Sequence, residues 1–310
     1  MLYRTFHSLQ KQPGTSAPRR GILDDPDEEF LDPASLALHS ALMSMNKSFK
    51  QFKPSRVIAC FDRPNNWRKL YTGSDLSVTG VPYKGNRRQE MTPTQQEQYY
   101  KLLDHMKEFE DLLQEQTGIV TVAGKGLEAD DCIAGWVQNN PSRRKVIMTL
   151  DSDISQLIDE TTSVCNFKTG ELVVCDDPKY LLFEKTFRGD SSDNIPSAVP
   201  RIRETKIRKA YEDPYTLTNI LQGDHVTRSG KIVPVSAVIE ENQLLMDLTK
   251  QPPEIRALID QAIDKAVNKT KRFDYWGFAK FCKERKLTKI QDSLPTFRPL
   301  LVGGYGNGRN

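Results

Sequence analysis

The hydrophobic positions along the chain follow two different periods. Three short apolar runs, residues 56–61, 118–123 and 145–150, are rich in β-branched residues and have the length of buried strands. Between the first two runs, residues 92–116 carry apolar side chains three and four positions apart, which is typical of one face of a long helix. Strands that alternate with helices predict an α/β unit with a mostly parallel sheet.

From residue 176 onward the pattern turns helical, and a chain of 310 residues is long enough for two lobes. We therefore expect an α/β core over residues 1–175, with a basic and aromatic segment at about residues 67–95 extending from it. A helical lobe is expected over residues 176–310.

Acidic residues gather near the predicted strand ends. Asp62 follows the first apolar run and Asp151 follows the third, and the carboxyl ends of parallel strands meet at one edge of a sheet. The remaining acids fall into short clusters nearby or further along the chain: Glu128, Asp130 and Asp131; Asp153 beside Asp151; and Asp190 with Asp193. Helix capping or a turn would explain any one cluster, but it is a poorer explanation for all of them together.

Carboxylates that converge repel one another unless a cation lies between them. No histidine or cysteine lies at ligand spacing among these acids. Donor sets made only of oxygen favour Mg²⁺ or Mn²⁺ over zinc. The sequence therefore predicts a site for hard divalent cations.

Composition adds little about partners, because the net charge is only +3. Local charge says more: residues 53–90 hold eight basic and three acidic side chains, and residues 201–209 hold five basic and one acidic. The five scattered cysteines favour a reducing compartment, and we find neither a signal peptide nor a membrane-spanning run. We expect a soluble, cytoplasmic monomer without a membrane partner.

The motifs around the acids resemble those of the 5′ nucleases, the family of phage 5′–3′ exonucleases, flap endonucleases and the 5′-nuclease domain of bacterial DNA polymerase I. The matching segments are L-E-A-D-D at 127–131, L-D-S-D at 150–153, F-R-G-D-S-S-D-N-I-P at 187–196, and shorter matches at 61–62, 67–68, 71 and 83–87. The resemblance implies a PIN-like sheet flanked by helices, an arch over the active site, and a helix-turn-helix lobe that binds duplex DNA.

The resemblance also implies a reaction: hydrolysis of DNA at 5′ flaps or free 5′ ends with two Mg²⁺ ions, for which Mn²⁺ could substitute. Primer or flap removal in phage replication is the implied role, with RNA–DNA hybrids and replication proteins as further possible partners. The implied metal ligands are Asp62, Glu128, Asp130, Asp131, Asp151, Asp153, Asp190 and Asp193, with Lys84 and the bridging Asp151 as catalytic residues. The implied DNA-binding residues are Arg68, Tyr83, Lys84, Arg87, Arg88, Arg201, Arg203 and Lys206.

The chain departs from the family pattern in two places. Residues 1–7 resemble the family segment that follows its first strand, but that strand and its aspartate have no counterpart. We expect the coding sequence to begin further upstream, because omitting an inner strand leaves ladder groups unpaired; Asp24 or Asp25 could otherwise supply the ligand. Arg201 and Arg203 stand where the family has glycines, which puts a potassium site in doubt.

Two other functions fit the same residues. The first is a structure-specific DNA-binding protein that has lost cleavage, and the second is a PIN-type ribonuclease, which shares the acidic sheet edge but lacks the 187–196 motif. For Trp67 and Tyr71, packing in the core is an alternative to stacking on DNA bases.

Overall fold

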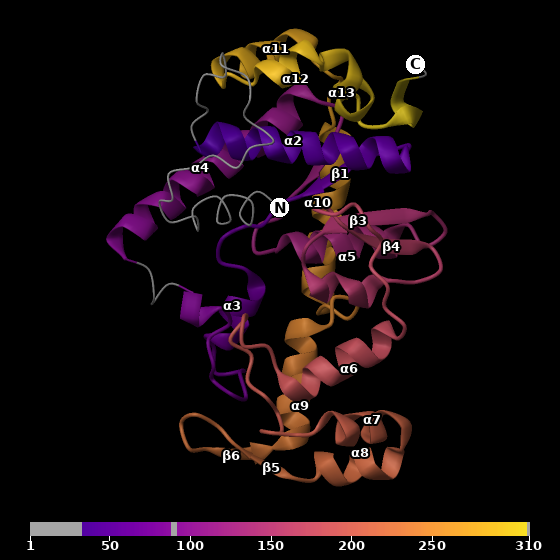
Figure 1. Ribbon diagram of the computed structural model, residues 1–310. Coiled ribbons are helices and arrows are strands. Elements are labelled where there is room, and N and C mark those ends of the chain that lie inside the picture. Colours follow the sequence, from indigo (N-terminus) through magenta and orange to yellow (C-terminus); the bar gives the residue numbers. More distant parts are fainter. Residues whose placement is uncertain (1–32, 88–91, 309–310) are drawn as a thin grey trace, which may run out of the picture.

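The computed structural model describes residues 33–87 and 92–308, and it contains a strand in each of the three apolar runs from which the sequence predicts one (Figure 1). Strand β1 (Ile58–Cys60) pairs in parallel with β2 (Val120–Val122), and β3 (Lys145–Thr149) pairs in parallel with β4 (Thr162–Asn166). Among the described residues these are two separate two-stranded sheets, with no pairing between β1 and β3. Parallel strands flanked by helices confirm the predicted PIN-like α/β architecture.

Two long helices cover one face of β1. Helix α2 (Pro33–Phe52) and the predicted long helix, α4 (Pro93–Gln116), pack there, and the C-terminal helices lie on their far side (Figure 1). These are α11 (Tyr275–Glu284), α12 (Thr288–Asp292) and α13 (Leu294–Leu301), followed by the short helix η3 (Tyr305–Gly308). Fully buried Leu113, Phe278 and Leu301 join the two groups in one hydrophobic core. The apolar stripe of α4 therefore serves packing.

A second group of helices covers the opposite face. Helix α5 (Ala129–Asn139) packs against β1, β2 and β3, and α10 (Pro253–Lys269) packs against β2 and α5. A capping box starts α5: the Glu128 side chain accepts from the N3 backbone, while the Asp131 side chain accepts from the Glu128 backbone. Three short helices lie in the connections: α3 (Trp67–Thr72), η1 (Gly85–Arg87) and η2 (Ser152–Leu157).

The remaining elements form the other end of the molecule. Helices α6 (Pro178–Arg188), α7 (Glu204–Glu212), α8 (Pro214–Leu221) and α9 (Val235–Met246) surround a core of their own, with the hairpin β5 (Asp224–Val226) and β6 (Ile232–Pro234) beside them (Figure 1). Asp177 and Asp213 cap α6 and α8, each followed by a proline in the first turn.

The hydrophobic cores do not follow the expected boundary at residue 176 throughout. Helices α6–α9 pack around a core of their own, whereas α10–α13 return to the N-terminal part and pack on α5, β2, α2 and α4. Sequence periodicity shows that a helix has an apolar face but not which partner covers that face. None of the helices in residues 33–87 and 92–308 is both long and apolar enough to cross a bilayer.

Candidate active site

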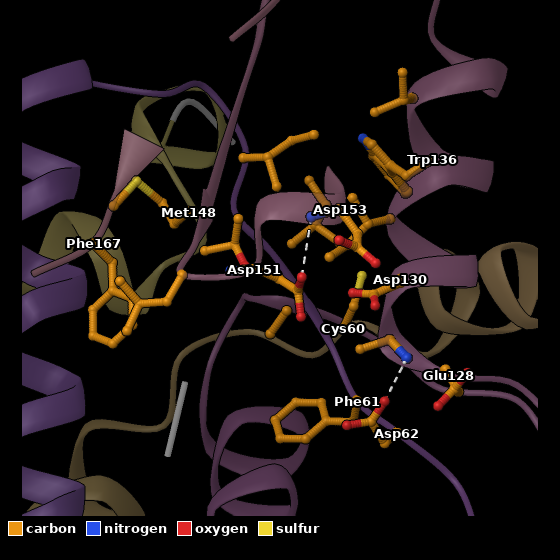
Figure 2. Close-up of a pocket in the computed structure, with 18 of the residues that line it drawn as sticks. Cys60, Phe61, Asp62, Glu128, Asp130, Trp136, Met148, Asp151, Asp153 and Phe167 are labelled. Atoms are coloured by element: carbon orange, nitrogen blue, oxygen red, sulfur yellow. Dashed lines mark hydrogen bonds between the residues drawn. The ribbon is translucent and has the colours of Figure 1, made fainter. Parts of the chain in front are cut away.

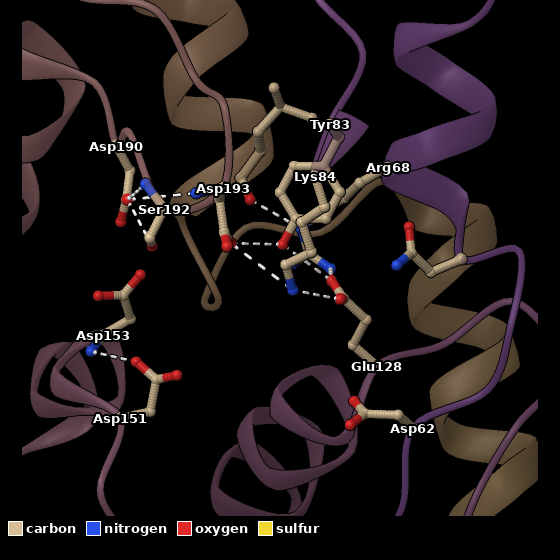
Figure 3. A network of polar contacts seen from close by, with 12 residues as sticks. Asp62, Arg68, Tyr83, Lys84, Glu128, Asp151, Asp153, Asp190, Ser192 and Asp193 are labelled. Atoms are coloured by element: carbon tan, nitrogen blue, oxygen red, sulfur yellow. Dashed lines mark hydrogen bonds and ion pairs between the residues drawn. The ribbon is translucent and has the colours of Figure 1, made fainter. Parts of the chain in front are cut away.

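Four separate segments bring acidic side chains into one cavity of about 2370 Å³. Besides Glu110 of α4, which pairs with Arg63, the acids that line it are Asp62, Glu128, Asp130, Asp151, Asp153, Asp190 and Asp193. They come from the end of β1, the start of α5, the end of β3 and the loop after α6 (Figures 2 and 3). Asp151 and Asp193 thus share a cavity although they are far apart in sequence, and seven of the eight predicted metal-ligand residues are gathered there.

The first group of acids lies where β1, β3 and α5 meet. Asp62 accepts a hydrogen bond from the Ala129 amide (2.8 Å), and Asp151 accepts one from the Asp153 amide (3.1 Å) (Figure 2). Burial, together with the charges of Asp151, Asp62 and Glu128, raises the pKa of Asp130 to about 8. Negative charge is therefore concentrated here, in a set of oxygen donors that fits a hard divalent cation.

The second group contains a lysine that belongs to none of the sequence motifs. The ammonium of Lys185 contacts Asp153 and lies 3.3 Å from Asp190. Burial raises the pKa of Asp153 despite this lysine, whereas at Asp190 hydrogen bonds from Ser192 and the charge of Lys185 outweigh burial and lower the pKa. Lys185 lies five residues before Asp190 in α6, and its distance in sequence from the L-D-S-D motif concealed the contact with Asp153.

Asp190 is held by a tight loop. The Ser192 amide and hydroxyl donate to its carboxylate at 2.8 and 2.7 Å. Gly189 precedes it with a φ of 71°, and a Cβ there would lie 2.4 Å from the Ile195 carbonyl oxygen. Glycine is therefore required at this position both for its backbone angle and for the close approach of the chain.

Glu128 connects the cavity to a buried ionic network. Arg68, whose side chain is only 2% exposed, donates to Asp131 at 2.8 and 3.0 Å and to Glu128 at 3.1 Å. The Trp67 indole also donates to Asp131, at 3.2 Å. Asp131 is fully buried with both carboxylate oxygens engaged, and neither it nor buried Arg68 lines the cavity. Trp67 likewise packs in the core. The metal-binding role of Asp131 and the DNA-binding role of Arg68 stay predictions.

Tyr83 and Lys84 lie on the cavity side of Glu128. The Lys84 ammonium is 2.6 Å from Glu128 and 3.6 Å from Asp193, and the Tyr83 hydroxyl lies 2.8 Å from Asp193 and 3.1 Å from Glu128 (Figure 3). Burial and the Glu128 charge raise the pKa of Tyr83 well above its usual value, so it stays protonated. The Tyr83 hydroxyl thus holds the Glu128 and Asp193 carboxylates by hydrogen bonds. Because Tyr83 is only 6% exposed, it offers no face on which a DNA base could stack.

The other predicted DNA-binding residues lie elsewhere. Arg201, Arg203 and Lys206 are exposed at the start of α7, outside the lining of the cavity. Arg88, Asp24 and Asp25 lie outside the described residues, as does the side chain of Arg87.

The fit to metal ions differs between the two acidic groups. As arranged within the described ranges, no three His, Cys, Asp or Glu side chains meet the spacing of a metal site. Around Asp62, Asp130 and Asp151 the surplus negative charge favours a cation, whereas Lys185 already compensates Asp153 and Asp190. The first group thus has the chemistry of a cation site, and the second would hold a cation only if Lys185 moved.

Comparison with known proteins agrees with this geometry. The family model for the 5′–3′ exonuclease N-terminal resolvase-like domain matches residues 1–185. No curated protein matches the sequence.

Solved structures from bacteriophage T5 share the fold. A T5 5′-exonuclease with bound zinc ions is 17% identical, with 87% of this chain and 96% of that chain covered and a TM-score of 0.61. A T5 protein co-crystallised with metal ions is 18% identical, covering 77% and 93% with a TM-score of 0.57. A T5 flap endonuclease complex with DNA and metal ions is also 18% identical, covering 76% and 90% with a TM-score of 0.56.

Proposed function

Since the chain belongs to the family of the 5′–3′ exonuclease N-terminal resolvase-like domain, we propose that it hydrolyses DNA phosphodiesters at 5′ flaps or free 5′ ends. The observation that carries this proposal is the convergence of seven carboxylates from four segments around one cavity, with Lys84 at its wall. Removal of primers or flaps during phage replication is the biological role we propose, on DNA or on RNA–DNA hybrids.

Divalent cations are part of the proposed chemistry. Asp62, Glu128, Asp130 and Asp151 would hold the first ion, and Asp153, Asp190 and Asp193 would surround a second. When bound, such ions lower the pKa of water towards neutrality and neutralise charge on the phosphate. Mg²⁺ is the proposed ion, because the donors are all oxygens.

The chain's own cations would position the substrate. The Lys84 amide donates to the Asp193 carbonyl (2.8 Å), and its ammonium reaches the cavity, where it pairs with Glu128 and Asp193. A scissile phosphate in the cavity would meet this ammonium, which favours the charge that develops during hydrolysis. Exposed Arg201, Arg203 and Lys206 would contact duplex phosphates away from the reaction centre.

Incubation with end-labelled substrates tests the proposal. The full chain would be mixed with flap DNA, blunt duplex DNA and single-stranded RNA, in Mg²⁺, Mn²⁺ or EDTA. We expect cleavage of the flap DNA only with a divalent ion, loss of cleavage in Asp151→Asn, and no loss in the matched control Asp292→Asn on α12. Cleavage of RNA alone would instead support the PIN-type ribonuclease.

A second candidate is a DNA-binding protein that does not cleave. The ion pairs that Lys185 makes with Asp153 and Asp190 favour it, because the lysine occupies the space between two proposed ligands of the second ion. Salt-sensitive binding of flap DNA without cleavage in Mg²⁺ or Mn²⁺ would support this candidate over the nuclease.

A further inference from the structure

The segment that follows α3, residues 73–82, contains neither helix nor strand and is anchored on α9. Glu241 of α9 is only 2% exposed, and its carboxylate accepts a hydrogen bond from the Ser77 hydroxyl at 2.6 Å. The same carboxylate accepts from the amides of Val78 (3.1 Å) and Thr79 (2.8 Å). Hydrogen bonds to an ionised acceptor are stronger than those between neutral groups. One buried carboxylate therefore holds this turn through three consecutive residues.

The connection from the turn to Lys84 is short and packed. Only four residues separate Thr79 from Lys84, and two of them, Val81 and Tyr83, are buried. The Tyr83 amide also donates to the Thr72 hydroxyl at 3.0 Å, which ties the connection back to the end of α3. A displacement of the turn would therefore be passed on to Lys84, because no slack loop lies between them.

The backbone of Lys84 has a conformation that must be held in place. Its φ is 54°, in the left-handed region, which costs energy for a residue that carries a Cβ. Its amide donates to the Asp193 carbonyl at 2.8 Å, and the neighbouring Asn194 side chain donates to the Pro82 carbonyl at 2.8 Å. Strained conformations persist only where the surrounding structure holds them. The position of Lys84 thus depends on how its own segment and the facing loop are fixed.

The facing loop, which carries the second acidic group, is held by the next residue of α9. Asn242 is fully buried, and its side-chain amide donates to the carbonyls of Thr186 (2.8 Å) and Pro196 (3.0 Å), which lie on either side of that loop. Successive residues of a helix point about 100° apart, so Glu241 and Asn242 reach two different segments. Helix α9, packed beside α6, is therefore the common support of both (Figure 1).

We propose that Glu241 is a positioning residue of the nuclease and that it acts through Lys84. Its carboxylate fixes the turn at residues 77–79, and the short buried connection then places the Lys84 ammonium opposite the loop that Asn242 holds. Glu241 does not line the cavity, so it would touch neither the substrate nor a bound ion. This role rests on the proposed function, because the place of the ammonium matters for the rate only if a phosphodiester is cleaved beside it.

Steady-state cleavage of 5′-flap DNA by the full chain tests this role. Glu241→Gln keeps the size of the side chain, but one oxygen becomes an NH₂ group, so at least one of the three donors loses its acceptor. We expect kcat to fall about tenfold and KM to stay within about twofold, because Lys84 is placed to meet charge that develops during hydrolysis. The matched control is Glu240→Gln, the exposed neighbour on α9, which should cut like the wild type.

A double-mutant cycle separates positioning from a general structural role. In the Lys84→Met background, Glu241→Gln should lower kcat by less than about twofold, because the side chain that it positions is already absent. An equal loss in both backgrounds would overturn the proposal, as would a wild-type kcat in the single variant Glu241→Gln.

Amide hydrogen exchange provides a measurement that does not depend on cleavage. In Glu241→Gln we expect exchange to become about tenfold faster at Val78, at Thr79 and also at Lys84. Exchange at Ile147, inside the β3–β4 sheet, should not change. Faster exchange in the turn with Lys84 unchanged would show that the carboxylate holds only the turn, and faster exchange at Ile147 would show general loosening. Either result would overturn the proposal.

The two measurements also distinguish this proposal from the proposed function. If the wild type cuts no flap DNA with Mg²⁺ or Mn²⁺, the nuclease function is wrong, and exchange at Lys84 still decides whether Glu241 sets the place of that lysine. If the wild type cuts but the cycle shows equal losses, the nuclease function stands and the positioning role is wrong.

Discussion

Asp130 and Asp131 are neighbours in the first turn of α5, yet they lie in opposite environments. Asp131 points inward, is fully buried and is neutralised by Arg68 at 2.8 Å. Asp130 points to the cavity, where other carboxylates raise its pKa to about 8. The Asp131 carboxylate therefore stabilises the fold, whereas the Asp130 carboxylate stores a repulsion that a bound cation would relieve.

The largest expected effect is the loss of stability when Asp131 loses its partner Arg68. Arg68→Met should lower the free energy of unfolding by about 3–5 kcal/mol, because it leaves buried Asp131 and Glu128 without their guanidinium partner. Urea unfolding at pH 7 measures this change, and the exposed neighbour variant Lys69→Met serves as the control. A loss below about 1 kcal/mol, typical of a surface pair, would contradict the stabilising role of the network.

On the Asp130 side we expect a loss of cleavage instead. Asp130→Asn should reduce the rate on flap DNA about 100-fold, which corresponds to about 2.7 kcal/mol of transition-state stabilisation. Its unfolding free energy in EDTA should not fall, since one source of repulsion is removed. A variant that cuts normally, or that unfolds as easily as Arg68→Met, would contradict the different roles given to Asp130 and Asp131.

The dependence of stability on pH separates the two aspartates further. The pKa of Asp130 rises from 3.8 to about 8 on folding, so the folded state binds this proton more tightly than the unfolded state does. In EDTA the stability contributed by this group is therefore present at low pH and is lost as pH rises from about 4 to about 8.

We expect the wild type to lose about 1–2 kcal/mol between pH 5 and pH 8 relative to Asp130→Asn, a value discounted because the side chain reaches an open cavity. Thermal unfolding across that range measures the difference. Adding Mg²⁺ at pH 8 should restore stability to the wild type but not to the variant. Parallel pH profiles for the two proteins would show that Asp130 carries no stored repulsion.

The smallest effect is expected at Lys84, on the boundary between the two sides. Lys84→Met should change the free energy of unfolding by less than about 1 kcal/mol, because Arg68 still pairs with Glu128. Cleavage should nevertheless fall, and a Lys84→Arg variant should recover part of it. Exposed Lys107→Met is the control for loss of a surface charge. A large loss of stability in Lys84→Met would make Lys84 part of the buried network.

Much of the fold was predictable because its signals are local. Apolar runs of strand length and a period near 3.6 in residues 92–116 fixed β1, β2, β3 and α4 to within a few residues. The rule that parallel strands meet at their carboxyl ends was enough to bring Asp62 and Asp151 together. Which helices would cover the sheet was not predictable, since α10–α13 return from beyond residue 250 to pack on it.

The sequence by itself determined the strands, the long helix and the supply of carboxylates at the sheet edge, because these depend on residue type and spacing along the chain. Only the tertiary structure decided that Asp131 and Arg68 neutralise each other inside the protein, that Lys185 lies between Asp153 and Asp190, and that acids from four segments line one cavity. The physical reason is that the protonation and pairing of a charged group depend on the groups that lie within a few ångströms of it. Those neighbours come from segments far apart in the sequence.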